Sequence, residues 1–351
     1  MGGRDGRGRG SRFAIVLSVA SALLAGTAAL KAMVPSPHAE APLAVEATPV
    51  PLDPTDPSRL RVGPLEYQGG LWLRGDDLRF GGLSDLRVSP DGETLFAVSD
   101  CGSGFTAHVS YDASGRLAGL RGARVVGLTD AHGKPLAADA VDAESLVVAP
   151  GAGLDVGFEG RGRIERYGPA FEGPARPEPV PAALAECGRN GGLELMADAG
   201  SGKRLLVCEG RRGASTTVPA WIGDPGSWHE REYPLTFDGG WAGEPFRPTS
   251  AARLPSGDLL VLERRFPPIA ARIVRLDRAS LEGDGPLEPH EIARLEAPLT
   301  LDNFEGIEAR QDARGRTLVY LLSDDNGCTK NAGAARRGLQ RTLLLLFVLA
   351  G

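Results

Sequence analysis

Short apolar runs alternate with Gly- and Pro-containing turns along most of the chain, and the body of the chain has no long segment with a 3.6-residue period. Each run has the length of a β-strand, and the turn residues mark where strands end. The run 94–99, for example, follows the turn 90–92 (Pro-Asp-Gly), and the run 258–262 follows 255–257 (Pro-Ser-Gly). Pro presets φ in such turns, and Gly accepts a positive φ. The pattern predicts an all-β protein.

A two-part acidic motif returns five times along this pattern. One acid begins a strand, and a second acid ends the next strand after a Gly-bearing turn. The first acids are Asp85, Glu144, Glu194 and Glu305, and the fourth copy has Thr249-Ser250 at this place. The second acids are Asp100, Glu159, Glu209, Glu263 and Asp324. The step from first to second acid is identical in the first three copies (85 to 100, 144 to 159, 194 to 209) and longer in the last (305 to 324).

A repeat of about 50–60 residues built from short strands indicates a β-propeller-like ring. We predict about five to six four-stranded blades. The apolar segments 65–73 and 341–349 precede and follow the repeats, and we expect them to share one blade that closes the ring and removes exposed strand edges. Acids at one position of every unit would then converge on the axis of the ring.

Residues 1–34 form a separate segment. Four arginines precede the uncharged apolar run 13–30, which is the pattern of an export signal, and the length of this run is near the lower limit for a membrane span. A cleaved signal peptide and an uncleaved signal anchor both remain open, because Pro42 would hinder cleavage at the small-x-small site 39–41. We predict a periplasmic or secreted protein, and the anchor alternative adds tethering to the inner membrane through residues 13–30. We further predict a Pro-rich linker over 35–64 and a propeller domain over 65–351.

The formal net charge is −6, and acidic residues outnumber basic ones in the body of the chain after the leader. Nucleic acid is a poor partner for such a body, whereas cations are better ones. The sequence has no G-x-S-x-G elbow and no H-E-x-x-H motif, which argues against an α/β-hydrolase and a zinc protease. No C-x-x-C occurs either, so a zinc site is not expected.

The four cysteines, Cys101, Cys187, Cys208 and Cys328, are compatible with zero to two disulfides in an exported protein. Cys101 and Cys328 each follow a second acid, in the first and last copies of the repeat. These copies are neighbours in a closed ring. A disulfide that clasps the ring and a pair of unpaired thiols are the two alternatives.

Many carboxylates near one axis would repel each other and raise each other's pKa unless a hard cation neutralises them. Oxygen-only ligation favours Ca²⁺ or Mg²⁺, and we expect a divalent cation, with Ca²⁺ as the first choice. The predicted metal ligands and catalytic residues are Asp100, Glu144, Glu194, Glu305 and Asp324.

In copies two to four the second acid is a Glu with an Arg two positions later, on the same face of an extended strand. These arginines are Arg161, Arg211 and Arg265, and we predict that they bind the anionic group of a substrate. The alternative is structural, with each Glu–Arg pair fixing the order of the blades.

Together these motifs resemble those of the bacterial phytase-like domain proteins, a family described by esterase-like activity of phytase. The stretches that carry the resemblance are 80–84, 89–92, 98–100, 142–144, 190–194, 262–266, 302–307, 322–326 and 339–343. They cover roughly residues 78–349, and the resemblance implies an exported, propeller-like protein. The chain departs from the pattern at 327–338, where an insert separates Asp-Asp-Asn from Leu-Gln-Arg-Thr. For this reason Asp325 and Asn326 are not among the expected ligands.

These features predict an exported, metal-assisted hydrolase whose partner is a small anionic substrate, a phosphate ester or another small ester. The sequence signals no protein nucleophile, so a water activated by the metal is the expected nucleophile. The alternative is a non-catalytic periplasmic binding or scaffold propeller in which the acids and arginines are structural, because a fold does not decide a function.

Overall fold

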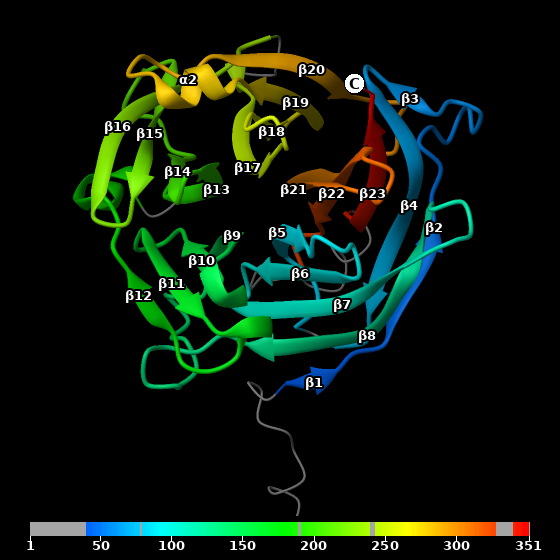
Figure 1. Cartoon of the computed structure of the whole chain (residues 1–351), viewed down its shortest axis with the longest axis horizontal. Helices are drawn as coiled ribbons and strands as arrows, with labels where there is room; N and C mark the ends of the chain where they lie inside the picture. The colour runs from blue at the N-terminus through cyan, green and yellow to red at the C-terminus, as the bar shows by residue number, and fades with distance from the viewer. Residues whose placement is uncertain (1–39, 78, 189–190, 239–242, 328–339, 351) are drawn as a thin grey trace, which may run out of the picture. The chain divides into compact units, whose positions relative to one another are not determined.

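Five antiparallel sheets, each with one copy of the acidic repeat on its innermost strands, surround a central axis in the computed structural model of the chain (Figure 1). The structure describes residues 40–77, 79–188, 191–238, 243–327 and 340–350. Residues Glu40–Gly351 form one unit, and this unit is a five-bladed β-propeller. The predicted all-β propeller is therefore confirmed, with five blades.

Each blade runs from an innermost to an outermost strand. Blade 1 contains β5 (Leu83–Val88), β6 (Thr94–Ser99), β7 (Ser103–Tyr111), β8 (Leu117–Gly127) and the short edge strand β1 (Ala41–Pro42). Blade 2 contains β9 (Ala143–Val148), β10 (Leu154–Phe158), β11 (Arg163–Tyr167) and β12 (Arg176–Glu178). Blade 3 contains β13 (Leu193–Gly200), β14 (Lys203–Cys208), β15 (Thr217–Asp224) and β16 (Ser227–Pro234).

Blade 4 contains β17 (Arg247–Arg253), β18 (Leu259–Arg265), β19 (Ala270–Leu276) and β20 (Pro289–Leu295). Blade 5 contains β21 (Asn303–Gln311), β22 (Thr317–Asp324), β23 (Thr342–Leu349), β4 (Leu65–Gly75) and β2 (Val45–Pro49), and β3 (Arg61–Val62) pairs with β4. Short helical segments lie between strands: η1 (Pro150–Ala152), η2 (Pro169–Phe171), η3 (Ala182–Cys187) and α2 (Arg278–Glu282).

The ring closes in blade 5, where strands from opposite ends of the chain pair. β23 hydrogen-bonds to β22 on one side and to β4 on the other, with Leu344 opposite Leu71 and Leu349 opposite Leu65. This confirms the predicted closure by the segments 65–73 and 341–349. The pairing leaves neither β4 nor β23 as an open edge that another chain could extend.

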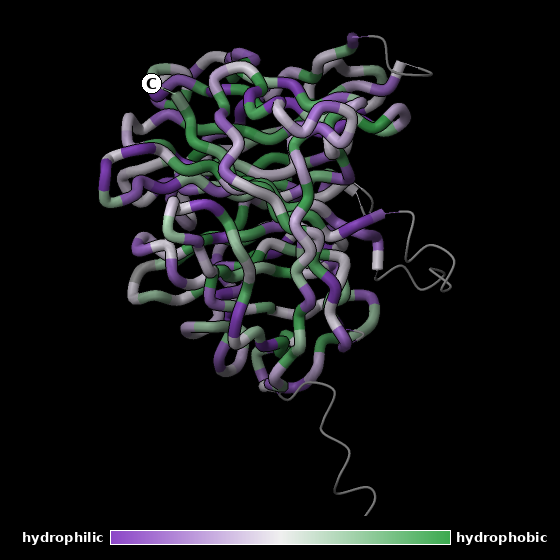
Figure 2. The backbone as a smooth tube through the Cα atoms, turned by 90° about the vertical axis from the view of Figure 1, so that its right-hand side faces the viewer, coloured by the Kyte–Doolittle hydropathy of each residue, from purple (hydrophilic) through white to green (hydrophobic). Residues whose placement is uncertain are grey.

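The hydrophobic core is divided into clusters between neighbouring blades. β23 is apolar on both faces because both faces are covered: Leu343, Leu345 and Phe347 pack toward blade 4, whereas Leu344 and Leu346 pack toward blade 1. This follows from the two-residue period of a strand. Figure 2 shows many hydrophobic residues along the strands and many hydrophilic ones in the connecting turns.

One buried ion pair joins all five blades at the axis. Asp85 and Arg87 of β5 are 3.0 Å apart and nearly inaccessible. Asp85 accepts hydrogen bonds from the Leu146 backbone N–H in blade 2 and the Ser250 hydroxyl in blade 4. Arg87 donates to main-chain carbonyls of three other blades, those of Met196, Ala251 and Ile307. We call Asp85 and Arg87 the axial pair.

The predicted linker spans 35–64, and its described part, residues 40–64, belongs to the propeller unit instead. β2 pairs with β4 along the outer edge of blade 5, and β1 pairs with β8 at the edge of blade 1. Edge strands tolerate Pro because one side of the strand needs no N–H donor, which is why the composition misled the prediction. The propeller unit begins near Glu40 rather than at Leu65.

The predicted leader, residues 1–34, lies outside the described residues. Within the part of the chain that the structure describes, no helix has the length and hydrophobicity needed to cross a membrane.

Three of the four cysteines, Cys101, Cys187 and Cys208, lie within the described residues. Cys187 and Cys208 form a disulfide next to blade 3, and Cys101 is also disulfide-bonded. Cys328, which the sequence suggested as a partner of Cys101, lies outside the described residues.

Candidate functional site

Each innermost strand has a β-bulge at the same place. The ladder between the first two strands of every blade skips one residue, and the five skipped residues are Ser84, Glu144, Glu194, Thr249 and Glu305. A bulge bends the strand and turns the extra side chain away from the regular alternation. The glutamates of blades 2, 3 and 5 meet: carboxylate oxygens of Glu144, Glu194 and Glu305 lie within 4.8 Å of one another.

A second set of five residues follows from the same register. In each blade the residue before the bulge pairs with one residue of the second strand. The set consists of the residues that follow these partners along the chain: Asp100, Glu159, Glu209, Arg264 and Asp324. Blade 4 therefore has an arginine where the other blades have an acid.

The register corrects two alignments made from the sequence. Asp85 follows the bulge residue Ser84 and belongs to the axial pair. Glu263 pairs with Pro248, one position before the second-acid place, so its side chain points to the opposite face of the strand. There it accepts hydrogen bonds from Tyr233 and Arg272.

The sequence does contain a signal that would have found Arg264. The step along the chain from the bulge residue Thr249 to Arg264 equals the step from Glu144 to Glu159 and from Glu194 to Glu209. Counting from the bulge residue, rather than matching acid to acid, places Arg264 at the second-acid position of blade 4.

The structure brings all five predicted acidic ligands together, with three further acids. Carboxylates of Asp142 and Glu159 lie within 4.8 Å of Glu144, and those of Glu159 and Glu209 lie equally close to Glu194. We call the whole group the acid cluster. Its members are Asp100, Asp142, Glu144, Glu159, Glu194, Glu209, Glu305 and Asp324.

Arg264 is the one cation of the described residues that forms ion pairs with the acid cluster. Its guanidinium lies 3.2 Å from Glu305 and 3.7 Å from both Glu194 and Glu209. A single guanidinium cannot balance eight neighbouring carboxyl groups, so the cluster holds excess negative charge whenever its members are ionised.

Several carboxyl groups of the acid cluster have raised pKa values. Burial, followed by the neighbouring charges of Glu305 and Asp142, raises the pKa of Asp100 to about 8. Burial and the Asp142 and Glu209 carboxylates raise the pKa of Glu159 to about 7. Burial is also the leading cause that holds the pKa of Glu144, of Glu194 and of Asp324 well above the ordinary value.

The acid cluster fits a hard divalent cation. All of its donors are carboxylate oxygens, which Ca²⁺ and Mg²⁺ prefer. Asp100 Oδ1 is buried and has no hydrogen-bond partner among the described residues, and a buried polar atom without a partner calls for a missing ion or water. The carboxylates of Glu144, Glu194 and Glu305 are close enough to share one ion.

The raised pKa values predict how the metal-free protein responds to pH. A carboxyl group with a higher pKa in the folded state binds more protons when folded, so raising the pH favours unfolding. With a chelator present, the free energy of unfolding should therefore fall as the pH rises from about 5 to 8, a range that ends at the pKa of Asp100, about 8. Denaturant titrations across this range measure it.

An Asp100→Asn variant is the control for this pH dependence, because it should show a shallower decline. Added Ca²⁺ should reduce the decline in the wild type, since the ion binds the ionised form. A free energy of unfolding that rises over the same pH range in chelator would contradict the assigned electrostatics.

The three predicted substrate arginines lie elsewhere and, within the described residues, form no ion pair with the acid cluster. Arg161 is exposed and pairs with Asp139 at 2.6 Å. Arg211 is exposed and lies over the Phe237 ring, 5.7 Å from its centroid. Neither these two nor Arg265 forms an ion pair, in the described part of the chain, with the Glu two positions before it. The predicted same-face Glu–Arg pairing is therefore wrong.

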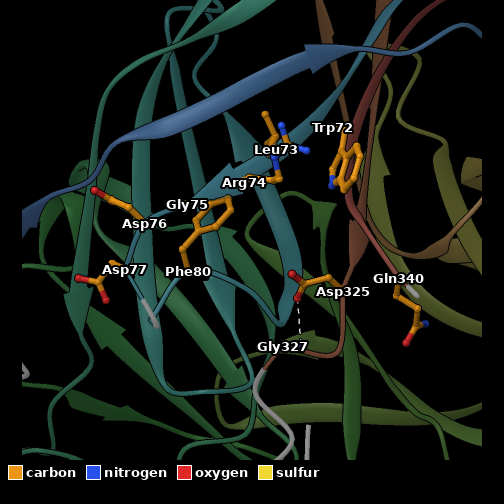
Figure 3. Close-up of a pocket in the computed structure, with 10 residues that line it drawn as sticks. All are labelled: Trp72, Leu73, Arg74, Gly75, Asp76, Asp77, Phe80, Asp325, Gly327 and Gln340. Carbon is orange, nitrogen blue, oxygen red and sulfur yellow. Dashed lines mark hydrogen bonds between the residues drawn. The ribbon is translucent and has the colours of Figure 1, made fainter. Parts of the chain in front are cut away.

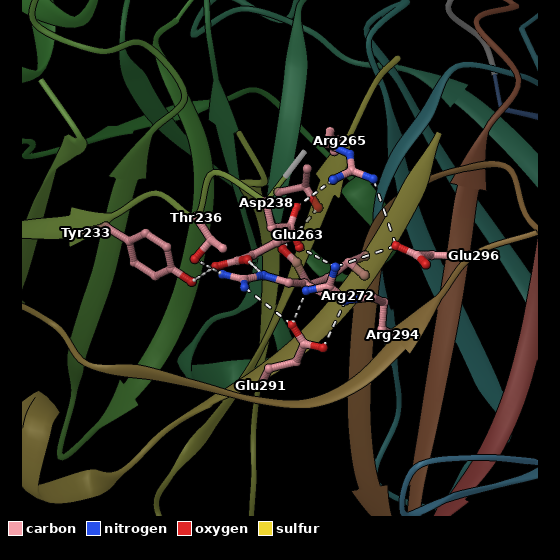
Figure 4. A network of polar contacts seen from close by, with 11 residues as sticks. Tyr233, Thr236, Asp238, Glu263, Arg265, Arg272, Glu291, Arg294 and Glu296 are labelled. Carbon is pink, nitrogen blue, oxygen red and sulfur yellow. Dashed lines mark hydrogen bonds and ion pairs between the residues drawn. The ribbon is translucent and has the colours of Figure 1, made fainter. Parts of the chain in front are cut away.

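Arg265 belongs to a polar network on the outer part of blade 4 (Figure 4). Its guanidinium pairs with Asp238 at 2.5 Å. Arg265, Arg272 and Arg294 all approach the Phe246 ring, at 4.7, 5.1 and 5.1 Å from its centroid. Cation–π contacts and ion pairs of this kind hold strands together, which supports the structural alternative for Arg265.

Asp325 and Asn326 follow the acid cluster at the end of β22. Asp325 accepts hydrogen bonds from the backbone N–H groups of Gly82 and Gly327, both at 2.9 Å. Figure 3 shows its carboxylate in a cavity of about 250 Å³ beside Trp72 and Phe80. These contacts hold the loop, and the charge of Asp325 is among the causes that raise the pKa of Asp100 and of Asp324.

A larger cavity, of about 790 Å³, adjoins the acid cluster between blades 4 and 5. Two of its lining residues connect it to the acid cluster. Glu305 belongs to the cluster, and Arg264 forms an ion pair with Glu305. The other lining residues are Phe266, Ile269, Leu301, Asp302, Asn303, Asn326, Gln340 and Arg341. The arrangement of cavity, carboxylates and arginine is suited to binding a small molecule next to a cation.

The fold and this site define a class: a five-bladed β-propeller with a carboxylate cluster at its axis and a cavity beside it. The chain belongs to the phytase-like family, whose description is esterase-like activity of phytase and whose family model matches residues 78–327. Membership supports a hydrolase-type propeller.

Comparisons with solved structures show only distant likeness. U3-55K is 11% identical, with 77% of this chain and 96% of that chain covered and a TM-score of 0.42. The RRP9 WD40 repeats are 11% identical, with 87% and 100% covered and a TM-score of 0.44. Virginiamycin B lyase from Staphylococcus aureus is 10% identical, with 87% and 100% covered and a TM-score of 0.37. No curated protein matches the chain.

Proposed function

We propose that this chain is an exported, metal-assisted hydrolase that acts on phosphate esters or other small esters. The observation that carries the proposal is the acid cluster, in which eight carboxyl groups from four blades face one arginine beside a cavity of about 790 Å³. The leader pattern of residues 1–34 supports export, and its apolar run 13–30 would tether the protein to the membrane if it is not cleaved.

The donor set for the cation is Glu144, Glu194 and Glu305, with Asp100 and Asp324 adjacent. Ca²⁺ fits such flexible oxygen ligation better than Mg²⁺, which demands a near-ideal octahedron. When bound, the ion would supply Lewis-acid polarisation of the ester and a lower pKa for an attacking water.

The protein groups have separate tasks in this proposal. Arg264 holds the anionic group of the substrate, because its guanidinium lines the cavity and lies 3.2 Å from Glu305. Glu159 accepts a proton from the attacking water, because its carboxylate lies within 4.8 Å of Glu144 and Glu194, beside the proposed cation.

The alternative function is a non-catalytic binding or scaffold propeller. The network of Glu263, Arg265 and Arg272 favours it in blade 4, because all three groups are held by structural partners. The acid cluster does not fit this alternative, since only Arg264 balances it among the described residues.

The test is a hydrolysis assay on the full-length chain with p-nitrophenyl phosphate, p-nitrophenyl acetate and phytate, in Ca²⁺ and in chelator. We expect at least one substrate to be hydrolysed in Ca²⁺ only, and Glu194→Gln to lower kcat/KM by about a hundredfold or more. Glu186→Gln is the matched control, since Glu186 is exposed. Equal rates in Ca²⁺ and chelator, or no hydrolysis of any substrate, would leave the scaffold alternative.

A further inference from the structure

The residues that line the cavity beside the acid cluster indicate which class of substrate the cavity binds. This inference rests on the proposed function. Among the described residues, the charged lining of the cavity consists of two cations, Arg264 and Arg341, and two acids, Asp302 and Glu305. The four charges of this described lining balance each other. The two arginines are the positively charged side chains of this described lining that can bind an anionic group.

Both arginines already have carboxylate partners. Arg264 Nε lies 3.2 Å from Glu305. Arg341 Nε lies 3.2 Å from Asp302, and another of its N–H groups donates to the Leu301 carbonyl at 3.1 Å. A bound cation at the acid cluster would release Arg264 from Glu305, whereas Arg341 would keep its partner Asp302. Among the described lining residues, Arg264 is thus the arginine available to an anionic group of a ligand.

The rest of the wall is apolar and partly exposed. Phe266, Ile269 and Leu301 line the cavity, and Phe266 is 62% exposed, the largest exposed fraction among the large hydrophobic residues of the described chain. An aromatic side chain held in water at the rim of a cavity is suited to stack on a flat apolar group of a ligand.

We infer that the substrate is an ester that combines an anionic group with an apolar or aromatic organic group. The anionic group lies at Arg264 beside the acid cluster, and the organic group packs on Phe266, Ile269 and Leu301. Phe266 is the residue that selects for an aromatic group.

Binding calorimetry of the full-length chain with two phosphonates in Ca²⁺ tests this inference without turnover. Phenylphosphonate and methylphosphonate carry the same anionic group and differ in the apolar group. The wild type should bind the phenyl compound about tenfold or more tightly than the methyl compound. Phe266→Ala should remove most of this preference and leave methylphosphonate binding unchanged.

Phe237→Ala is the matched control, because Phe237 is also an exposed aromatic residue but does not line the cavity. It should keep the full preference for the phenyl compound. Equal binding of the two phosphonates by the wild type, or an unchanged preference in Phe266→Ala, would overturn the inference.

The result is separable from that of the hydrolysis assay. Preferential binding of phenylphosphonate together with no ester hydrolysis would remove the proposed function and support the cavity assignment. Ca²⁺-dependent hydrolysis with no preference for the phenyl group would support the proposed function and overturn the cavity assignment.

Discussion

Replacing Arg87 by Met should lower the free energy of unfolding by about 3–5 kcal/mol, because it leaves a buried carboxylate without its counter-ion. Asp85 is fully buried, and burial already raises its pKa to about 6 although Arg87 opposes the shift. The substitution also removes the donors that reach the main-chain carbonyls of blades 3, 4 and 5. Denaturant unfolding at neutral pH measures the loss.

Arg253→Met is the matched control for Arg87→Met. Arg253 ends the innermost strand of blade 4 and pairs with Asp198 at 3.7 Å, but both side chains are largely exposed. Such a pair contributes about 0–1 kcal/mol. The double variant Asp85→Asn/Arg87→Met should be less destabilised than the sum of its single changes. If Arg87→Met unfolds at the same midpoint as Arg253→Met, the axial pair does not join the blades.

Replacing Arg264 by Gln should have opposite effects on cation binding and on catalysis. A positive charge about 4 Å from the ligands opposes a second cation by several kcal/mol at an effective dielectric constant near 20. Removing it should tighten Ca²⁺ binding by about tenfold or more. For phosphate esters kcat/KM should fall by about tenfold or more while neutral esters are spared, because the guanidinium no longer binds the anionic group.

Arg211→Gln is the control for Arg264→Gln, since Arg211 lies over Phe237 and forms no ion pair with the acid cluster among the described residues. It should change neither Ca²⁺ affinity nor the ratio of the two ester classes. Weaker Ca²⁺ binding in Arg264→Gln, or equal losses on phosphate and neutral esters, would contradict the role assigned to Arg264.

The repeat, the propeller and the strand pair that closes the ring could be predicted because each follows from a local sequence pattern. The two-residue period and the turns define strands, and the apolar run 342–349 implies a strand covered on both faces. The convergence of Glu144, Glu194 and Glu305 followed from their common place in each repeat. These predictions needed no knowledge of the register between strands.

The register between neighbouring strands determines which residues of the five blades are equivalent, and the sequence alone did not reveal this register. Matching acid to acid aligned Asp85 and Glu263 with the cluster, but each lies one position from the equivalent bulge or strand-end position. A shift of one position moves a side chain to the other face of a strand. Arg264 was missed for this reason. The axial pair and the large cavity depend on contacts between blades, which no local pattern encodes.

The central claim is that the acid cluster binds a divalent cation, and calorimetric titration of the metal-free, full-length chain with Ca²⁺ tests it most directly. We predict saturable binding that Glu144→Gln/Glu305→Gln weakens strongly. At a hundredfold excess of Ca²⁺ over its Kd, the wild type should gain about 2.7 kcal/mol of stability. A titration without saturable heat, or one that the double substitution leaves unchanged, would contradict the claim.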